Sequence, residues 1–115
     1  MNKEAILKHT TRYEDELIED LKDPEEAQAY LEAAFEAYEE DGDTEALLLA
    51  IRDVTEAQGG VGKLSKRISI SQQKLYEIMS SRSNPRLDNW LRIISGLGFH
   101  IRLEQQDVNT KSVPI

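Results

Sequence analysis

Two adjacent glutamines, a lysine and, three residues later, a glutamate form the stretch of this sequence with the clearest chemical use. A glutamine amide can pair bidentately with adenine N6 and N7 in the major groove of DNA, and a glutamate can accept from cytosine N4. The serine before the glutamines can begin a helix, because its hydroxyl can accept a backbone N–H from the first turn. Side chains of these types at the start of one helix are suited to reading base edges. The candidate base-reading residues are Ser71, Gln72, Gln73, Lys74 and Glu77.

The elements that must position these side chains are two short helices predicted within residues 61–79. Apolar residues recur there at three- and four-residue spacing, which is the helical period. The turn between the helices is too short to be a domain linker, and Ile70 can fill the corner. The pattern predicts a helix-turn-helix; the alternative is a helical hairpin with a polar surface, since short patterns of this kind are common by chance. The residues predicted to be buried are Val61, Leu64 and Ile68 in the first half and Leu75, Ile78 and Met79 in the second.

A polar loop is predicted over residues 80–86, where Pro85 prevents the second helix from continuing. Basic and amide side chains in this position could hold the sugar-phosphate backbone, which positions a protein on DNA without reading its sequence. The alternative for each is an ordinary solvated side chain. The candidate backbone contacts are Arg82, Asn84 and Arg86 in the loop, together with Lys63, Lys66 and Tyr76 in the two helices.

The charge of the chain is divided by position. The net charge is −8 over 115 residues, but residues 1–58 hold 18 acidic against 5 basic residues, whereas residues 59–115 hold 4 against 9. A basic C-terminal half can approach phosphate, whose neutralisation supplies most non-specific affinity for DNA. An acidic N-terminal half would be repelled by DNA and could attract a basic partner. The alternative is that the acidic helices are only soluble surface.

The rest of the chain predicts a mostly α fold. Asp23 and Pro24 begin a helix that Gly42 ends, and Asp43 or Thr44 begins another that ends before residues 59–60. We expect a bundle of about five helices containing a lambda-repressor-like helix-turn-helix. The inward positions are predicted to be Ala27, Tyr30, Leu31, Ala34, Phe35 and Tyr38 in the first of these helices, Leu47, Ala50, Ile51, Val54 and Ala57 in the second, and Leu87, Trp90 or Leu91, Ile94 and Leu97 in a last helix that Gly98 ends.

One short C-terminal β-strand is predicted by the alternation of Phe99, Ile101 and Leu103 with polar residues. A single strand needs an edge with which to pair. A second copy of the chain would supply one and give a two-fold dimer, as helix-turn-helix proteins use to meet half-sites one DNA turn apart. Pairing with an N-terminal segment within residues 10–18 is the alternative.

The expected organisation is an N-terminal arm over residues 1–22, a helical domain over 23–104 with the helix-turn-helix at 61–80, and a disordered tail over 105–115. The chain has no cysteine, and no apolar run approaches the roughly 20 residues of a membrane span. His9 and His100 stand alone, without metal-ligand spacing. We therefore expect a cytoplasmic protein without metal, cofactor or catalytic residues, which does not act as an enzyme and does not enter a membrane.

Residues 21 to about 103 resemble the antitoxins of addiction modules that carry an Xre/Cro-type helix-turn-helix, the HigA-like antidote proteins. The most specific matches are Asp23-Pro24 with Tyr30-Leu31, Gly42-Asp43, Leu75-Tyr76, and Asn84-Pro85 with Leu87-Asp88. The two glutamines also look like the start of the reading helix in lambdoid phage repressors.

The resemblance implies a cytoplasmic antitoxin that neutralises a co-encoded, basic, RelE-like ribonuclease toxin and represses its own operon as a dimer on double-stranded operator DNA. Related antitoxins place the toxin-binding region at different ends. The candidate toxin-binding residues here are Tyr13, Leu17, Glu25, Glu32 and Glu36.

The chain departs from the motif at two serines. Ser69 stands where the turn commonly has glycine, and a Cβ in a left-handed turn costs about 1 kcal/mol. Ser65 stands where alanine is usual and adds a hydroxyl at a tight helix contact. Two other functions remain open: a stand-alone prophage-type regulator without a toxin, and a toxin inhibitor whose helix-turn-helix is only structural.

Overall fold

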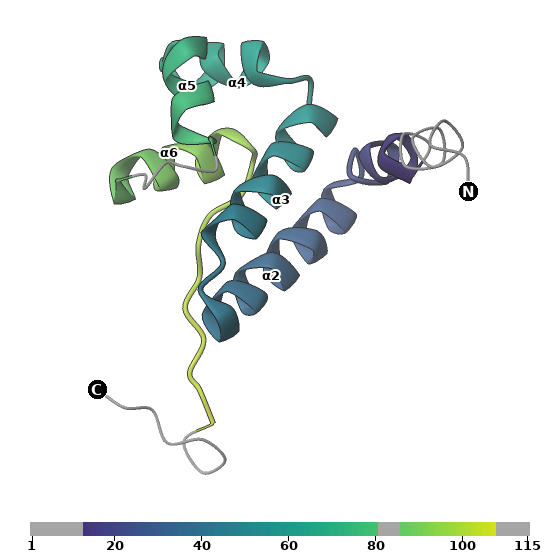
Figure 1. Ribbon diagram of the computed structural model, residues 1–115, viewed down its shortest axis with the longest axis vertical. Coiled ribbons are helices and arrows are strands. Elements are labelled where there is room, and N and C mark those ends of the chain that lie inside the picture. The colour runs from purple at the N-terminus through teal and green to yellow at the C-terminus, as the bar shows by residue number, and fades with distance from the viewer. Residues whose placement is uncertain (1–12, 81–85, 108–115) are drawn as a thin grey trace, which may run out of the picture.

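The described part of the computed structural model, residues 13–80 and 86–107, is all helical apart from turns and a C-terminal segment (Figure 1). The predicted mostly α fold is confirmed. Residues 13–20 form a helix that leads into the first of five further helices. These are α2 (Pro24–Asp41), α3 (Thr44–Ala57), α4 (Val61–Ile68), α5 (Gln72–Ile78) and α6 (Leu87–Gly96).

The ends of α2 and α3 follow from local chemistry that the sequence predicts. The Asp23 side chain accepts from the backbone N–H of Glu25 at 2.9 Å, and Pro24 occupies the first helical position. Gly42 ends α2 with φ +68°, in the left-handed region that favours glycine. Asp43 then accepts from the N–H of Ala46 at 3.1 Å and begins α3. The two helices therefore turn back sharply and pack side by side (Figure 1).

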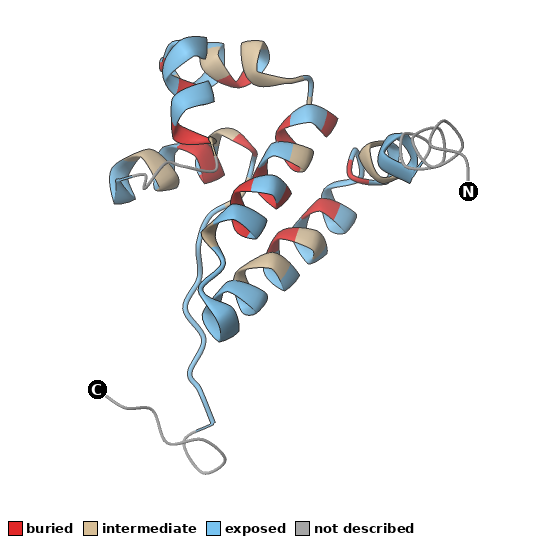
Figure 2. Cartoon of the chain, in the orientation of Figure 1, coloured by how far each residue is buried: buried red, intermediate tan, exposed pale blue. Residues whose placement is uncertain are grey.

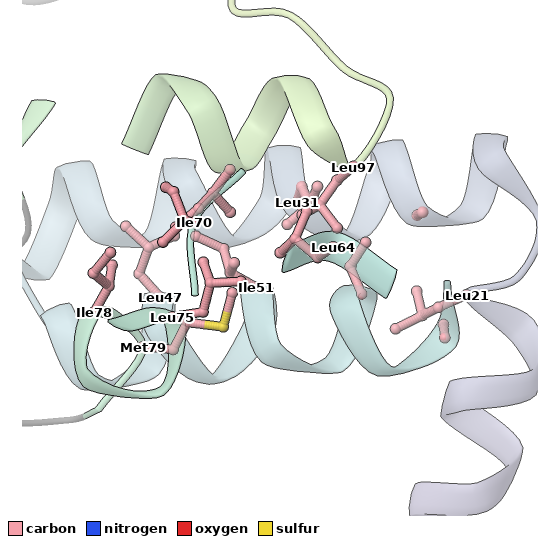
Figure 3. Packing of buried hydrophobic residues seen from close by; sticks show 14 residues of the cluster. Leu21, Leu31, Leu47, Ile51, Leu64, Ile70, Leu75, Ile78, Met79 and Leu97 are labelled. Atoms are coloured by element: carbon pink, nitrogen blue, oxygen red, sulfur yellow. The ribbon is translucent and has the colours of Figure 1, made fainter. Parts of the chain in front are cut away.

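The core lies where α3 meets the other helices, and red buried positions follow one side of α2 and α3 (Figure 2). Ile51 and Val54 of α3, Leu75 of α5 and Ile93 of α6 have no measurable exposure. Figure 3 shows side chains of α2, α3, α4 and α5 meeting in one cluster. The predicted inward residues of α3 and of the α4–α5 segment, apart from Ala50, belong to this cluster or pack against it, and Ala50 is buried outside it. The buried members are Leu47, Ile51, Val54, Ala57, Leu64, Ile70, Leu75, Ile78 and Met79, and Val61 and Ile68 pack against them.

Two inward assignments, Leu87 and Tyr38, need correction, and one buried residue of α6 was not predicted. Leu87 is 72% exposed, because it lies in the first turn of α6 beyond the edge of the core. Of the alternatives Trp90 and Leu91, Trp90 is partly buried and packs against the core, whereas Leu91 is 45% exposed. Ile93, which was not predicted, is fully buried beside Ile94. Tyr38 is also exposed, in the last turn of α2.

The predicted C-terminal strand is wrong for the described residues, since residues 99–107 contain neither helix nor strand. Phe99 packs against the core, but Ile101 is 51% and Leu103 is 98% exposed. In the view of Figure 1 the segment passes α3 after the end of α6 and then continues beyond the turn between α2 and α3. A strand requires a pairing edge, and the described part of this single chain offers none.

Candidate nucleic-acid interface

The polar side chains predicted to read bases share the exposed side of α5. The Ser71 hydroxyl accepts from the N–H of Lys74 at 3.1 Å, which confirms Ser71 as the N-cap of the helix. Leu75 and Ile78 are buried and hold α5 against the core. The opposite side carries a continuous group of exposed residues, consisting of Gln72, Gln73, Lys74, Tyr76 and Glu77.

The turn before α5 depends on the two serines that depart from the motif. Ser69 has φ +56° and ψ +42° and is the only described non-glycine residue with positive φ. The Ser65 hydroxyl donates to the carbonyl of Ile70 at 2.5 Å, directly across this turn. Since Ile70 is itself buried, the bond gives its carbonyl a partner that water could supply only poorly. The two departures therefore belong to one local structure.

The start of α4 makes room for the first reading residue. A Cβ placed on Gly62 would lie 3.5 Å from the Gln72 amide nitrogen, so the Gln72 side chain lies beside the first turn of α4. Lys63 and Lys66 are exposed on the same helix. The side chain of Gln72 thus lies near the preceding helix, and both it and the two lysines are exposed.

The remaining candidates for the DNA backbone are distributed unevenly. Tyr76 is 61% exposed on α5. Arg86 pairs with Asp88 at 3.4 Å, but both side chains are largely exposed, and such pairs contribute little to stability. Arg82 and Asn84 lie outside the described residues.

Two exposed arginines of the basic half donate hydrogen bonds to backbone carbonyls. Arg67 of α4 donates to the carbonyl of Gly96 at 3.2 Å, and Arg92 of α6 donates to the carbonyl of Ile68. Each of these carbonyls belongs to the last residue of a helix, where backbone acceptors lack helical partners. These roles were not predicted from the sequence, although Arg67 stands in the last turn of α4, where basic side chains commonly bond to free carbonyls.

The acidic surface is separate in the chain from α5 and is concentrated on α2. That helix holds seven acidic residues and no basic one, and Glu25, Glu32 and Glu36 are exposed. Tyr13 is 67% exposed, whereas Leu17 is partly buried and packs against the core. Leu17 therefore contributes to folding, and only part of the candidate toxin-binding set is open to solvent.

One polar pair joins the acidic helix to α3. The Tyr30 hydroxyl donates to Asp53 at 2.8 Å, and burial, followed by this bond to a carboxylate, raises the pKa of Tyr30 well above its ordinary value. Tyr30 consequently stays neutral and keeps α2 in register on α3. Among the described residues, no group of three His, Asp or Glu side chains could hold a metal ion, and no helix is long and apolar enough to cross a membrane.

Comparison with known proteins places these features in a family. A family model described as "probable addiction module antidote protein" matches residues 11–105. No curated protein and no solved structure matches the chain. Because the matched residues run from the helix before α2 through the C-terminal segment, the chain belongs to the family of probable addiction module antidote proteins.

Proposed function

We propose that this antidote protein is the antitoxin of a type II module, which neutralises a co-encoded basic ribonuclease of the RelE type and represses its own operon. In this proposal α4 and α5 act as a helix-turn-helix on double-stranded operator DNA. The observation that carries it is the outer side of α5, where two glutamines, a lysine and a glutamate are all exposed while Leu75 and Ile78 anchor the helix in the core.

The arrangement supports a defined division of labour on DNA. The first turn of α5 would enter the major groove, where Gln72 and Gln73 pair with base edges. Lys63 and Lys66 on α4, with Tyr76 and Arg86, would contact phosphates and set the orientation of α5. The first turn of α4 lies close to Gln72 and would limit the side-chain freedom that binding has to remove.

The acidic side supports recognition of a basic protein. Tyr13 and the exposed carboxylates of α2 would face the toxin, and opposite charge on the partner would speed association and favour the correct orientation. DNA would be repelled by the same side chains. The two partners are therefore expected to use different elements of the chain.

A homodimer is the third part of the proposal. Ile101 and Leu103 are exposed on a segment that leaves the helices, and burying two leucine-sized side chains in each of two copies would contribute several kcal/mol. A two-fold axis would place two copies of α5 on successive half-sites, about one DNA turn apart.

Base reading is tested with Gln72→Ala combined with Gln73→Ala in the full chain. Fluorescence anisotropy would measure binding to the DNA upstream of the gene and to a scrambled duplex of equal length. Each good bidentate pair contributes about 1–3 kcal/mol of discrimination, so the ratio of the two affinities should fall at least tenfold. Gln28→Ala on α2 is the matched control and should leave the ratio unchanged. An unchanged ratio in the double variant would remove the glutamines from the reading role.

Toxin binding is tested with Glu25→Gln, Glu32→Gln and Glu36→Gln combined. Surface plasmon resonance with the product of the neighbouring gene should show slower association, while affinity for operator DNA stays the same. The control replaces Glu45 and Glu56 of α3 by glutamine. Equal association rates for the two variants would move the toxin-binding surface away from α2.

A further inference from the structure

The ends of α4 and α6 meet at a glycine. A Cβ placed on Gly96 would come within 2.5 Å of Ile68 Cγ2 and 2.7 Å of Leu64 Cδ1, distances that real Cβ atoms essentially never show. The last turn of α6 therefore lies directly against two apolar side chains of α4. We call this contact, with the polar bonds around it, the α4–α6 joint.

Two arginines cross this joint in opposite directions. Arg67 donates from α4 to the carbonyl of Gly96, the last residue of α6. Arg92 donates from α6 to the carbonyl of Ile68, the last residue of α4. Each helix thus supplies the cationic cap of the other, and both charges lie at the negative end of a helix dipole.

Gln58 extends the joint to the end of α3. Its amide nitrogen donates to the carbonyl of Leu97 at 2.8 Å, and its amide oxygen accepts from Arg67 at 3.4 Å. Immediately afterwards, Gly98 N–H donates to the carbonyl of Ser95 and Phe99 N–H to that of Ile94. The C-terminal segment is therefore linked to the joint through the Leu97 carbonyl, while Gly98 and Phe99 bond back to the last turn of α6.

These bonds are suited to fixing an angle more than to holding the fold together. Arg67 and Arg92 are exposed, so water competes for their donors and each bond contributes modestly to stability. Apolar packing between Gly96, Leu64 and Ile68 is not directional. Two hydrogen bonds from opposite sides are directional, and they restrict rotation of α6 on α4.

We propose that Arg67 and Arg92 are positioning residues, which set the direction of the C-terminal segment relative to α4 and α5 and thereby the spacing of DNA half-sites that a dimer accepts. The inference rests on the proposed function for its DNA part, because spacing has meaning only for a dimer on two half-sites. Its geometric part concerns one chain alone and can be measured without DNA.

The geometric test uses two spin labels, and the absence of cysteine makes the labelling selective. One chain would carry both Gln73→Cys on α5 and Glu104→Cys on the C-terminal segment, with a spin label on each cysteine. It would be mixed with an excess of unlabelled chain, so that only distances within one chain are measured. Pulsed electron paramagnetic resonance would then measure the distribution of distances between the two labels. Arg67→Gln with Arg92→Gln should broaden this distribution or shift its centre. Arg52→Gln removes one exposed arginine of α3, which matches the loss of charge in each single variant, and it should leave the distribution as in the parent.

An unchanged distribution in the double variant would overturn the inference, whatever the protein does with DNA. The single variants, Arg67→Gln and Arg92→Gln, are measured in the same way, and circular dichroism confirms helical content. Each single variant should broaden the distribution less than the pair does, because one directional bond remains.

The functional test varies the distance between half-sites in a series of duplexes bound by the full-length chain. We compare the affinity for the preferred spacing with the affinity for a spacing two base pairs longer. The ratio of these two affinities should fall at least tenfold in the double variant, which loses two hydrogen bonds made by charged donors. The ratio is the readout because the general loss of affinity from removing two positive charges affects both spacings alike. A ratio equal to that of Arg52→Gln overturns the role in spacing. Absence of operator binding by the parent chain would instead contradict the proposed function, while the label distances still decide the geometric part.

Discussion

At the scale of single residues, Ser65 and Ser69 are two residues that depart from the usual motif and act on the same turn. Ser69 adopts a left-handed conformation that costs about 1 kcal/mol or more for a residue with a Cβ. Ser65 lies on the preceding helix and bonds to the carbonyl of Ile70, immediately after Ser69. The bond holds the backbone in the conformation that Ser69 alone would disfavour.

We predict that Ser65→Ala destabilises the fold by about 1 kcal/mol, the usual contribution of one hydrogen bond. Ser69→Gly should stabilise it by up to about 1 kcal/mol, because glycine adopts positive φ without steric cost. The greater freedom of glycine in the unfolded chain offsets part of this gain. Urea unfolding of both variants and of the double variant measures the coupling. Ser95→Ala, on an exposed position of α6, controls for loss of a hydroxyl. Strictly additive effects would show that the two serines act independently.

Tyr30 carries a prediction about pH. Its raised pKa means that the unfolded chain loses this proton at lower pH than the folded chain. The contribution of Tyr30 to stability is therefore fully present below the unfolded pKa of about 10 and decreases as pH rises above it. Tyr30→Phe should lower the free energy of unfolding by about 1 kcal/mol at neutral pH, because the bond to Asp53 is lost. At alkaline pH the free energy of unfolding should decrease less steeply with pH in this variant than in the parent.

Thermal unfolding between neutral and alkaline pH measures both effects. Tyr38→Phe is the matched control, because Tyr38 is exposed on the same helix. The same alkaline slope in Tyr30→Phe and in the parent would show that other groups govern unfolding there.

At the scale of elements, the contact between α4 and α6 depends on one missing side chain. We predict that Gly96→Ala destabilises the fold by about 1–3 kcal/mol, because the new methyl group would force Leu64 and Ile68 away. Gly62→Ala is the matched change within α4, where the added Cβ would meet only ordinary van der Waals contact with Gln72. Higher helix propensity should make that variant neutral or more stable, by up to about 1 kcal/mol.

Chemical denaturation measures the stability of the two alanine variants. Gly96→Ala should be less stable than the parent, and Gly62→Ala should be as stable or more stable. Equal stability of Gly96→Ala and the parent would mean that α6 can shift without cost. The helices at the α4–α6 joint would then move apart more easily than their close contacts indicate.

At the scale of the whole molecule, charge separation governs how the proposed partners are kept apart. The acidic surface lies on α2, while the basic residues proposed to meet DNA lie on α4, α5 and the start of α6. Affinity for DNA should fall steeply with salt concentration, because each phosphate contact releases counterions.

We predict that Lys66→Gln lowers DNA affinity without changing sequence preference, and reduces the slope of log affinity against log salt by about 1. Titrations at several salt concentrations measure the slope. Lys22→Gln is the control, since Lys22 pairs with Glu19 on the acidic side of the chain. An equal slope for the two variants would exclude a phosphate contact by Lys66.

Much of the fold could be predicted from the sequence because its signals are local. Asp23, Gly42 and Ser71 mark helix ends through their own backbone and side-chain chemistry, and the structure confirms each one. The apolar period assigned the inward face of α3 and of the α4–α5 segment, since a helix buries one face whatever lies opposite. The exposed group on α5 was predictable for the same reason.

Only the tertiary structure decided the features that depend on two distant segments. The bonds of Arg67 and Arg92 join positions 29 and 24 residues apart, and no local pattern reports which helix end lies nearby. Leu87 has the helical spacing of an inward residue, yet it is exposed, because burial depends on where α6 extends past the core. The C-terminal alternation has the period of a strand, but a strand forms only beside a pairing edge, and the described part of one chain supplies none. The sequence by itself determined the helices and their outer faces, because those follow from neighbouring residues. The three-dimensional packing decided which ends meet, because that contact is made by residues the chain separates.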